Sequence, residues 1–81
     1  MLQGALTVKT VPELWEQRAE LFKEQSVSLA AVTEVDSAGI AFLAQWAKAQ
    51  PQMKLKLSAV PENALRLIKT FKLQPLFELQ S

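Results

Sequence analysis

Segments with the hydrophobic period of a strand alternate along this chain with segments that have the period of a helix. This alternation constrains the fold more than any other feature. Apolar residues recur at every second position between Lys54 and Ser58, as in a half-buried strand. Elsewhere they recur at spacings of three and four, as in amphipathic helices. The predicted order is strand 2–8, helix 11–24, strand 26–35, helix 37–50, strand 54–58, helix 62–71 and strand 76–79. Strands separated by helices are joined by crossovers, which predicts an α/β fold with a mostly parallel, four-stranded sheet and about three helices.

Local signals indicate where the helices begin and end. Thr10 and Glu13 stand at the spacing of a capping box, so the Thr10 hydroxyl is expected to accept a hydrogen bond from the Glu13 backbone. Pro51 is expected to end the second helix, and Pro61 to occupy the first turn of the third. Phe71 continues the apolar stripe of that third helix and is expected to face the core.

Length and residue usage exclude several classes of function. The 81 residues are expected to form one domain over 1–81, and 49% of them are hydrophobic, which is enough for a core. Neither His nor Cys is present, so histidine general bases, thiolate nucleophiles and zinc sites of these ligands are excluded. Only Gly4 and Gly39 are glycines, too few for a phosphate-binding loop or a dinucleotide fingerprint. No catalytic residue, metal site or cofactor is predicted.

The net charge of +1 is too small to attract nucleic acid without sequence specificity, so we expect no nucleic-acid partner. The longest uncharged stretches, 25–33 and 37–47, are about half the length of a membrane span, so no direct membrane insertion is expected. The start of the chain lacks the pattern of a signal peptide. These features predict a cytoplasmic protein.

One candidate binding site lies where strand 26–35 leads into helix 37–50, from Val35 to Gly39. Ligands of open α/β sheets gather beyond the carboxyl ends of the strands, and a helix N-terminus stabilises a phosphate or a carboxylate. The alternative is structural: Asp36 or Ser37 caps the helix, while Ala38 and Gly39 are small enough for close packing.

Helix 37–50 is apolar on two sides. Ile40 and Leu43 belong to a stripe suited to packing on a sheet, whereas Phe42 and Trp46 lie nearly opposite. A helix of this kind must bury both sides or use one for a partner. We expect Phe42 and Trp46 to be exposed and to anchor an interface, the alternative being burial against neighbouring helices. The same outer face would also support a weak homodimer.

The segment from Val27 to Leu43 resembles the signature of STAS domains, in which a strand rich in Val and Leu leads into an Asp-Ser/Thr-x-Gly turn and a helix. Leu14 to Arg18 and the segment 2–6 are most similar to the STAS subunits of bacterial phospholipid-transport ABC complexes. The resemblance implies a STAS (SpoIIAA-like) fold. It also implies a non-catalytic cytoplasmic subunit, peripheral to the inner membrane, that binds and supports the transporter ATPase. From the turn and the apolar outer side of the helix we predict that the docking residues are Asp36, Ser37, Ala38, Gly39, Phe42 and Trp46.

One departure and one match bear on regulation. In STAS proteins that antagonise anti-sigma factors, the phosphorylated hydroxyl directly precedes the Gly, a position filled here by Ala38. Ser37, one position earlier, matches the hydroxyl of the transport subunits and is a candidate phosphorylation site, although Asp36 would repel a phosphate there.

Two alternative functions stay open. The first is an antagonist that binds a Ser/Thr kinase-like anti-sigma factor. The second is an enzyme built from Asp36, Ser37 and scattered Glu and Lys, which is disfavoured because the carboxylates of Glu13, Glu16, Glu20 and Glu24 follow the solvated face of a helix.

Overall fold

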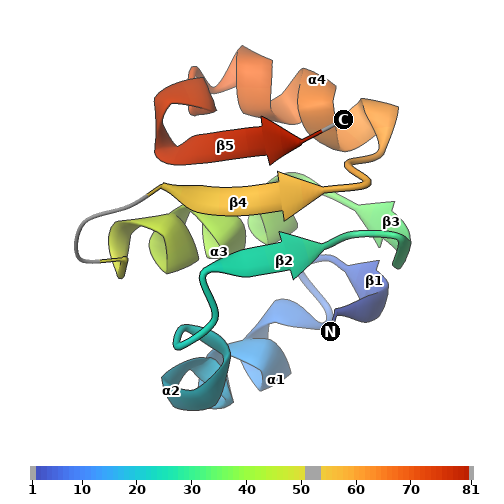
Figure 1. The fold of residues 1–81 in the computed structure, drawn as a ribbon. Helices are drawn as coiled ribbons and strands as arrows, with labels where there is room; N and C mark the ends of the chain where they lie inside the picture. Colours follow the sequence, from blue (N-terminus) through green and yellow to red (C-terminus); the bar gives the residue numbers. More distant parts are fainter. Residues whose placement is uncertain (1, 51–53, 81) are drawn as a thin grey trace.

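The strands pair in parallel and the helices lie on one face of them, as the computed structural model of residues 2–50 and 54–80 shows (Figure 1). The elements are β1 (Gln3–Leu6), α1 (Val11–Glu16), α2 (Arg18–Leu21), β2 (Ser26–Ser28), β3 (Ala31–Val35), α3 (Ser37–Lys48), β4 (Leu55–Ser58), α4 (Glu62–Thr70), the 3-10 turn η1 (Gln74–Leu76) and β5 (Phe77–Gln80). The predicted parallel α/β architecture is therefore confirmed.

The predicted strand 26–35 is divided in two, so the described residues form five strands instead of four. Its first part, β2, pairs with β4, which in turn pairs with β5; its second part, β3, pairs with β1. The division occurs at Leu29 and Ala30. The Leu29 N–H still donates to the Ser58 carbonyl at 3.0 Å, but the Leu29 carbonyl accepts from Val32 at 3.0 Å and turns the chain toward β1. One segment thus connects both groups of strands.

The predicted helix 11–24 is also divided, because it is interrupted at Gln17. The Gln17 N–H donates to the Leu14 carbonyl, a bond of 3-10 type that ends α1. The Arg18 guanidinium donates to the Trp15 carbonyl at 2.9 Å and lies 4.4 Å from the centre of the Trp15 ring. This contact accounts for Arg18 within an apolar stripe, since its charge stays in solvent while the side chain covers an aromatic ring.

The predicted capping box at the start of α1 is wrong. The Thr10 backbone is helical and its side chain caps no N–H of α1. Instead the Thr10 hydroxyl accepts from the Thr7 N–H at 3.0 Å and donates to the Ala5 carbonyl at 2.9 Å. Thr10 therefore closes the loop after β1, a competing use of a threonine hydroxyl that its spacing from Glu13 does not reveal.

The remaining elements agree with the predicted bounds to within two residues. Asp36 caps α3, and Pro61 precedes the first turn of α4 as its N-cap instead of lying within it. Pro51, predicted to end the second helix, lies outside the described residues. Phe71 directly follows α4 and is 48% exposed, so its predicted place in the core is wrong.

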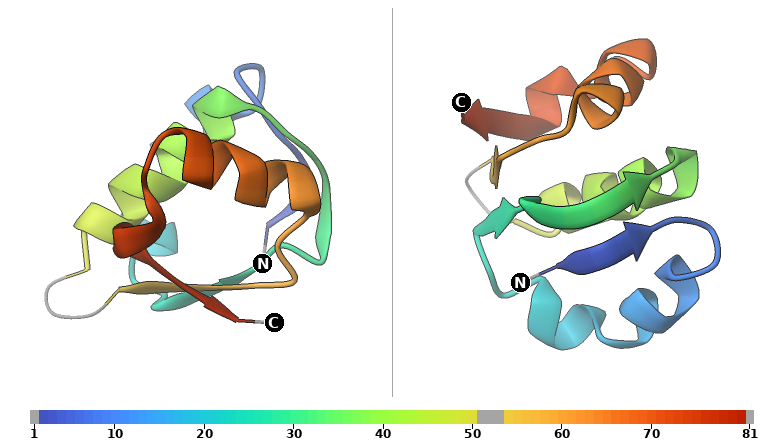
Figure 2. Two further views of the ribbon diagram at one scale, coloured as in Figure 1. Left: turned by 90° about the horizontal axis from the view of Figure 1, so that it is seen from above. Right: turned by 90° about the vertical axis from the view of Figure 1, so that its right-hand side faces the viewer.

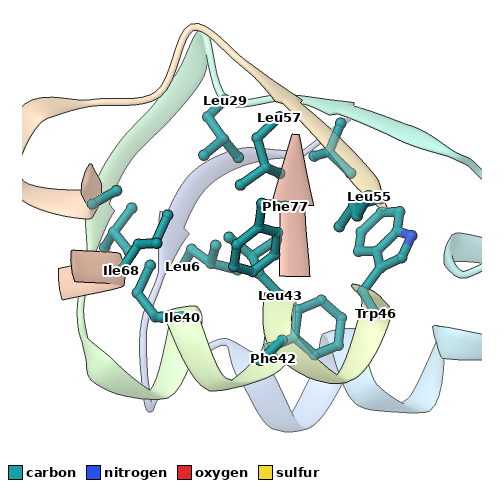
Figure 3. Packing of buried hydrophobic residues seen from close by; sticks show 14 of the residues in the cluster. Leu6, Leu29, Ile40, Phe42, Leu43, Trp46, Leu55, Leu57, Ile68 and Phe77 are labelled. Carbon is teal, nitrogen blue, oxygen red and sulfur yellow. The ribbon is translucent and has the colours of Figure 1, made fainter. Parts of the chain in front are cut away.

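Helix α3 occupies the centre of the domain, behind the strands and between α4 on one side and α1 on the other (Figures 1 and 2). Its contacts with α1, β3, α4 and η1 surround it on most sides. The side chains of the sheet and α4 that are buried against α3 include Leu6, Leu29, Leu55, Leu57, Ile68 and Phe77 (Figure 3). Helix α3 is thus the common partner of the surrounding layers.

The expected exposure of Phe42 and Trp46 is wrong, because each is only 2% exposed (Figure 3). Phe22 covers both rings, with centroid separations of 5.7 Å to Phe42 and 5.5 Å to Trp46. Trp15 adds an edge-on contact to Phe42 at 6.4 Å. The segment of α1 and α2 therefore supplies the second layer that buries the other side of α3, which is the alternative that the sequence left open.

Every helix within residues 2–50 and 54–80 falls short of the length and apolarity that crossing a membrane requires.

Candidate partner-binding site

Asp36 connects three parts of the chain at the end of β3. One carboxylate oxygen accepts from the Gly39 N–H at 3.0 Å and so caps α3, while the other accepts from the Val8 N–H at 3.0 Å. Its backbone N–H donates to the Leu6 carbonyl at 3.2 Å. Asp36 therefore fixes the loop after β1 against the start of α3.

The same bonds determine the charge state of Asp36. The backbone hydrogen bond from Val8, followed by that from Gly39, lowers the pKa of the Asp36 carboxyl below its ordinary value of 3.8. The positive end of α3 is thus already compensated by a carboxylate of this chain. A second anion at the same place would meet a negative charge and a Gly39 N–H already in use.

Gly39 lets α3 approach β1 closely. It is buried, and a Cβ at this position would overlap the backbone oxygen of Leu6 and lie 2.8 Å from the Leu6 Cγ. Any side chain would thus force the helix away from the strand. Asp36 and Gly39, both predicted as partner-binding residues, are occupied by contacts within the domain.

Ser37 is the member of the predicted site that is most accessible, since it is exposed in the first turn of α3, whereas Ala38 is half-buried. The outward side of α3 continues from Ser37 with Ala41, Gln45 and Lys48, all exposed. These four residues are called the α3 ridge. Phe42 and Trp46 lie on the other side of the helix and do not belong to this surface.

Open grooves flank the α3 ridge on both sides. One runs between α3 and the segment after α4, where Phe71 and Leu73 face Ala41 and Ala44. The other lies between α3 and the α1–α2 segment and includes Trp15, Arg18 and Lys48. The prediction from sequence missed Ala41, Gln45, Lys48 and Phe71. The first three share the helical spacing of Ser37, a signal that was available, whereas Phe71 follows the apolar period of α4 and gives no sign of exposure.

The carboxylates of the described residues do not form a metal-ligand cluster. Within 2–50 and 54–80, no group of three or more Asp or Glu side chains gathers as metal ligands would. Glu13, Glu16, Glu20 and Glu24 are exposed on the α1–α2 segment. What the site presents is a surface with small side chains, a hydroxyl and two grooves.

Replacing Asp36 with Asn is expected to lower the midpoint of urea denaturation at pH 7, because the amide retains one acceptor oxygen and no charge for the Val8 and Gly39 N–H groups. The folded-state pKa of Asp36 is lowered, so its contribution to stability is fully present above the ordinary value of 3.8 and is lost as the pH falls through the lower folded value. Urea titrations from neutral to acidic pH should show the difference between the two proteins shrink in acid.

Ser37→Ala is the matched control, since it changes an exposed side chain next to Asp36 and should leave the midpoint nearly unchanged. An equal midpoint for wild type and Asp36→Asn across the whole pH range would contradict the bridging role of the carboxylate.

The fold places this protein in the class of small parallel α/β domains. Its central helix α3 is capped by Asp36 and lies close to β1 at Gly39. Residues 1–78 match the family model described as "Mlab, STAS domain", and the chain belongs to this family. The resemblance found in the sequence is thereby confirmed. No curated protein and no solved structure gives a significant match to the chain.

Proposed function

We propose that this protein is a non-catalytic accessory subunit of an ABC transporter that moves phospholipid between the inner and outer membranes, and that it binds and supports the transporter ATPase in the cytoplasm. Membership of the MlaB-like STAS family supports this assignment. The observation that carries it is the α3 ridge, an exposed helix face on a domain whose conspicuous carboxylate, Asp36, is used internally. A rigid surface whose neighbouring carboxylate is already used within the domain fits a binding partner better than an enzyme.

The proposed docking surface differs from the predicted one. Ser37 stays in it, and Ala41 and Gln45 replace Phe42 and Trp46, which are buried. Asp36 and Gly39 act indirectly, because they set where the first turn of α3 lies relative to the loop at Val8. Small side chains at Ala41 and Ser37 let a partner approach the helix backbone closely, while the folded core keeps the surface rigid.

A bulky residue on the ridge tests this proposal. Ser37→Trp is expected to weaken binding of the purified ATPase subunit about tenfold or more, equivalent to about 1.4 kcal/mol, because the indole occupies space that the partner needs. The thermal midpoint should stay close to that of the wild type, since Ser37 is exposed. Co-purification and calorimetric titration against the ATPase subunit of the proposed transporter provide the measurement.

Thr33→Trp is the matched control, because Thr33 is also exposed but lies on β3, away from the ridge. Equal affinity of both variants would place the ATPase elsewhere on the domain. A second copy of this chain is the other occupant to test. Sedimentation velocity of the isolated protein measures whether such a dimer forms without the ATPase.

The signalling alternative has one observation in its favour, the exposed hydroxyl of Ser37, which a kinase could reach. Against it stands Ala38, which leaves no hydroxyl directly before Gly39. Phosphate at Ser37 would also lie beside the ionised Asp36. Phosphorylation of Ser37 by a kinase-like anti-sigma factor, with loss of signal in Ser37→Ala, would favour the antagonist over the transporter subunit.

A further inference from the structure

The groove between α3 and the end of α4 has a fixed shape. Ile40 and Ala44 are buried on its α3 side, and Phe71 stands 48% exposed on the other. The turn that holds Phe71 is tight: Lys72 adopts a left-handed conformation with φ of 56°, and the Leu73 N–H donates to the Ile68 carbonyl at 2.9 Å. With the Lys72 N–H bonded to the Lys69 carbonyl at 3.1 Å, this is a Schellman motif.

An exposed phenylalanine held in this way is already ordered for binding. Because the Schellman motif fixes the backbone on both sides of Phe71, this segment would lose little backbone conformational entropy when a partner contacts the ring. Ala41 and Ala44 lie across the groove and leave room for an apolar side chain of the partner. The groove therefore suits one inserted apolar residue, which is the geometry of an interface anchor.

Charge is divided unevenly over the domain. Residues 63–77 contain Arg66, Lys69 and Lys72 and no acidic residue, and the only charge within 37–50 is Lys48. By contrast, residues 10–25 carry four Glu against Arg18 and Lys23. Among the described residues, the ion pairs involve Lys23 and Lys56. They involve neither Lys48, which lines the groove, nor Lys72, which stands between the lining residues Phe71 and Leu73 in the chain. The groove side of the molecule is thus basic although the net charge is only +1.

We propose that this groove receives an acidic and apolar segment of the transporter ATPase, with one apolar side chain between Ala44 and Phe71 and carboxylates near Lys48 and Lys72. This proposal rests on the proposed function and adds the chemistry of the partner segment to it. Complementary charge raises the rate of encounter and selects the partner, while the apolar contact supplies affinity.

A protein segment fits better than an anionic membrane surface. Each basic residue near such a surface contributes roughly 1 kcal/mol, and the acidic α1–α2 segment of the same small domain opposes that attraction. A concave site with alanines on one side accommodates an inserted side chain, whereas a flat bilayer would contact mainly Phe71. The experiment must therefore distinguish binding to a membrane from binding of a protein segment in the groove.

The test is calorimetric titration of the full chain with the ATPase subunit of the proposed transporter. Phe71→Ala should weaken binding about tenfold, and Lys48→Glu with Lys72→Glu should do the same at low salt. The wild-type affinity should also fall when NaCl is raised from about 0.05 to about 0.3 M, because surface charges are screened. Thermal midpoints should change little, because all three side chains are exposed.

Two matched controls make the result specific. Leu79→Ala removes an apolar side chain that is 38% exposed on β5, away from the groove, and Lys54→Glu with Lys56→Glu makes the same change of charge at the start of β4, outside both grooves. Both should stay within about twofold of the wild type.

The outcomes separate the two proposals. Tight binding that is insensitive to the Phe71 and lysine variants would overturn the groove and leave the ATPase partner in place. Absence of ATPase binding by the wild type would overturn both. Co-sedimentation with vesicles of phosphatidylglycerol and phosphatidylcholine, abolished by the lysine variants, would assign the basic side to a membrane and overturn the groove proposal.

Discussion

Gly39→Ala is expected to destabilise the domain by about 3 kcal/mol, the upper part of the range for overpacked sites. The added methyl group would overlap the Leu6 backbone oxygen, and that oxygen also accepts the hydrogen bond of the Asp36 N–H. Leu6 itself is 1% exposed, so neither the strand nor the helix has room to retreat. For a domain of 81 residues, a loss of this size lowers the melting temperature by roughly 12 to 24 °C.

Gly4→Ala is the control, because the other glycine of the chain is expected to resist substitution through its backbone conformation and not through close packing. A Cβ at Gly4 meets nothing within 4 Å, but the residue has φ of +77°, which costs an alanine roughly 1 kcal/mol. In thermal denaturation followed by circular dichroism, the melting temperature of Gly39→Ala should therefore be well below that of Gly4→Ala. The reverse order would mean that α3 is free to move away from β1.

Elements whose limits depend on neighbouring residues could be predicted from the sequence. Asp36 marks the change from a strand period to a helix period, and its side chain does cap α3. Leu55 and Leu57 alternate with lysines, and both are fully buried in β4. Helix caps and hydrophobic periods depend on residues that are close in sequence, so they can be predicted without knowledge of the tertiary contacts.

Features that depend on distant contacts could not be predicted. The interruption of the first helix at Gln17 and the division of strand 26–35 follow from packing and from pairing with different strands on either side of Ala30. The second hydrogen bond of Asp36 reaches Val8, a residue 28 positions earlier. No periodicity within a segment reports such a contact.

The burial of Phe42 and Trp46 could not be predicted, because an apolar side chain looks the same in sequence whether a partner or the domain itself covers it. Seven of the twelve residues of α3 are buried, an arc wide enough to include both Ile40 and Phe42. The position of Phe22, which the α1–α2 segment brings over α3, shows that the domain itself covers the side of α3 with Phe42. The surface that remains is the arc of small and polar side chains.

Trp46→Ala is expected to cost about 3 to 5 kcal/mol of unfolding free energy, a large share of the roughly 4 to 12 kcal/mol that a chain of 81 residues possesses. The substitution removes a ring packed on Phe22 at 5.5 Å and on Phe42 at 6.1 Å. It also removes the indole N–H that donates to the Glu24 carbonyl at 2.9 Å, which ties the end of the α1–α2 segment to α3. Urea denaturation followed by far-ultraviolet circular dichroism measures the loss.

Trp46→Phe separates the two contributions, because it keeps an aromatic ring and removes the donor to Glu24. Its cost should be near 1 to 2 kcal/mol, about that of one hydrogen bond with some lost packing. Gln45→Ala, one position away but exposed on the α3 ridge, should change stability by less than about 0.5 kcal/mol. Loss of ATPase binding in Trp46→Ala would then report unfolding, whereas loss in a ridge variant of normal stability would report docking. A Trp46→Ala protein as stable as the wild type would show that the aromatic layer does not belong to the core, and would return Trp46 to the interface.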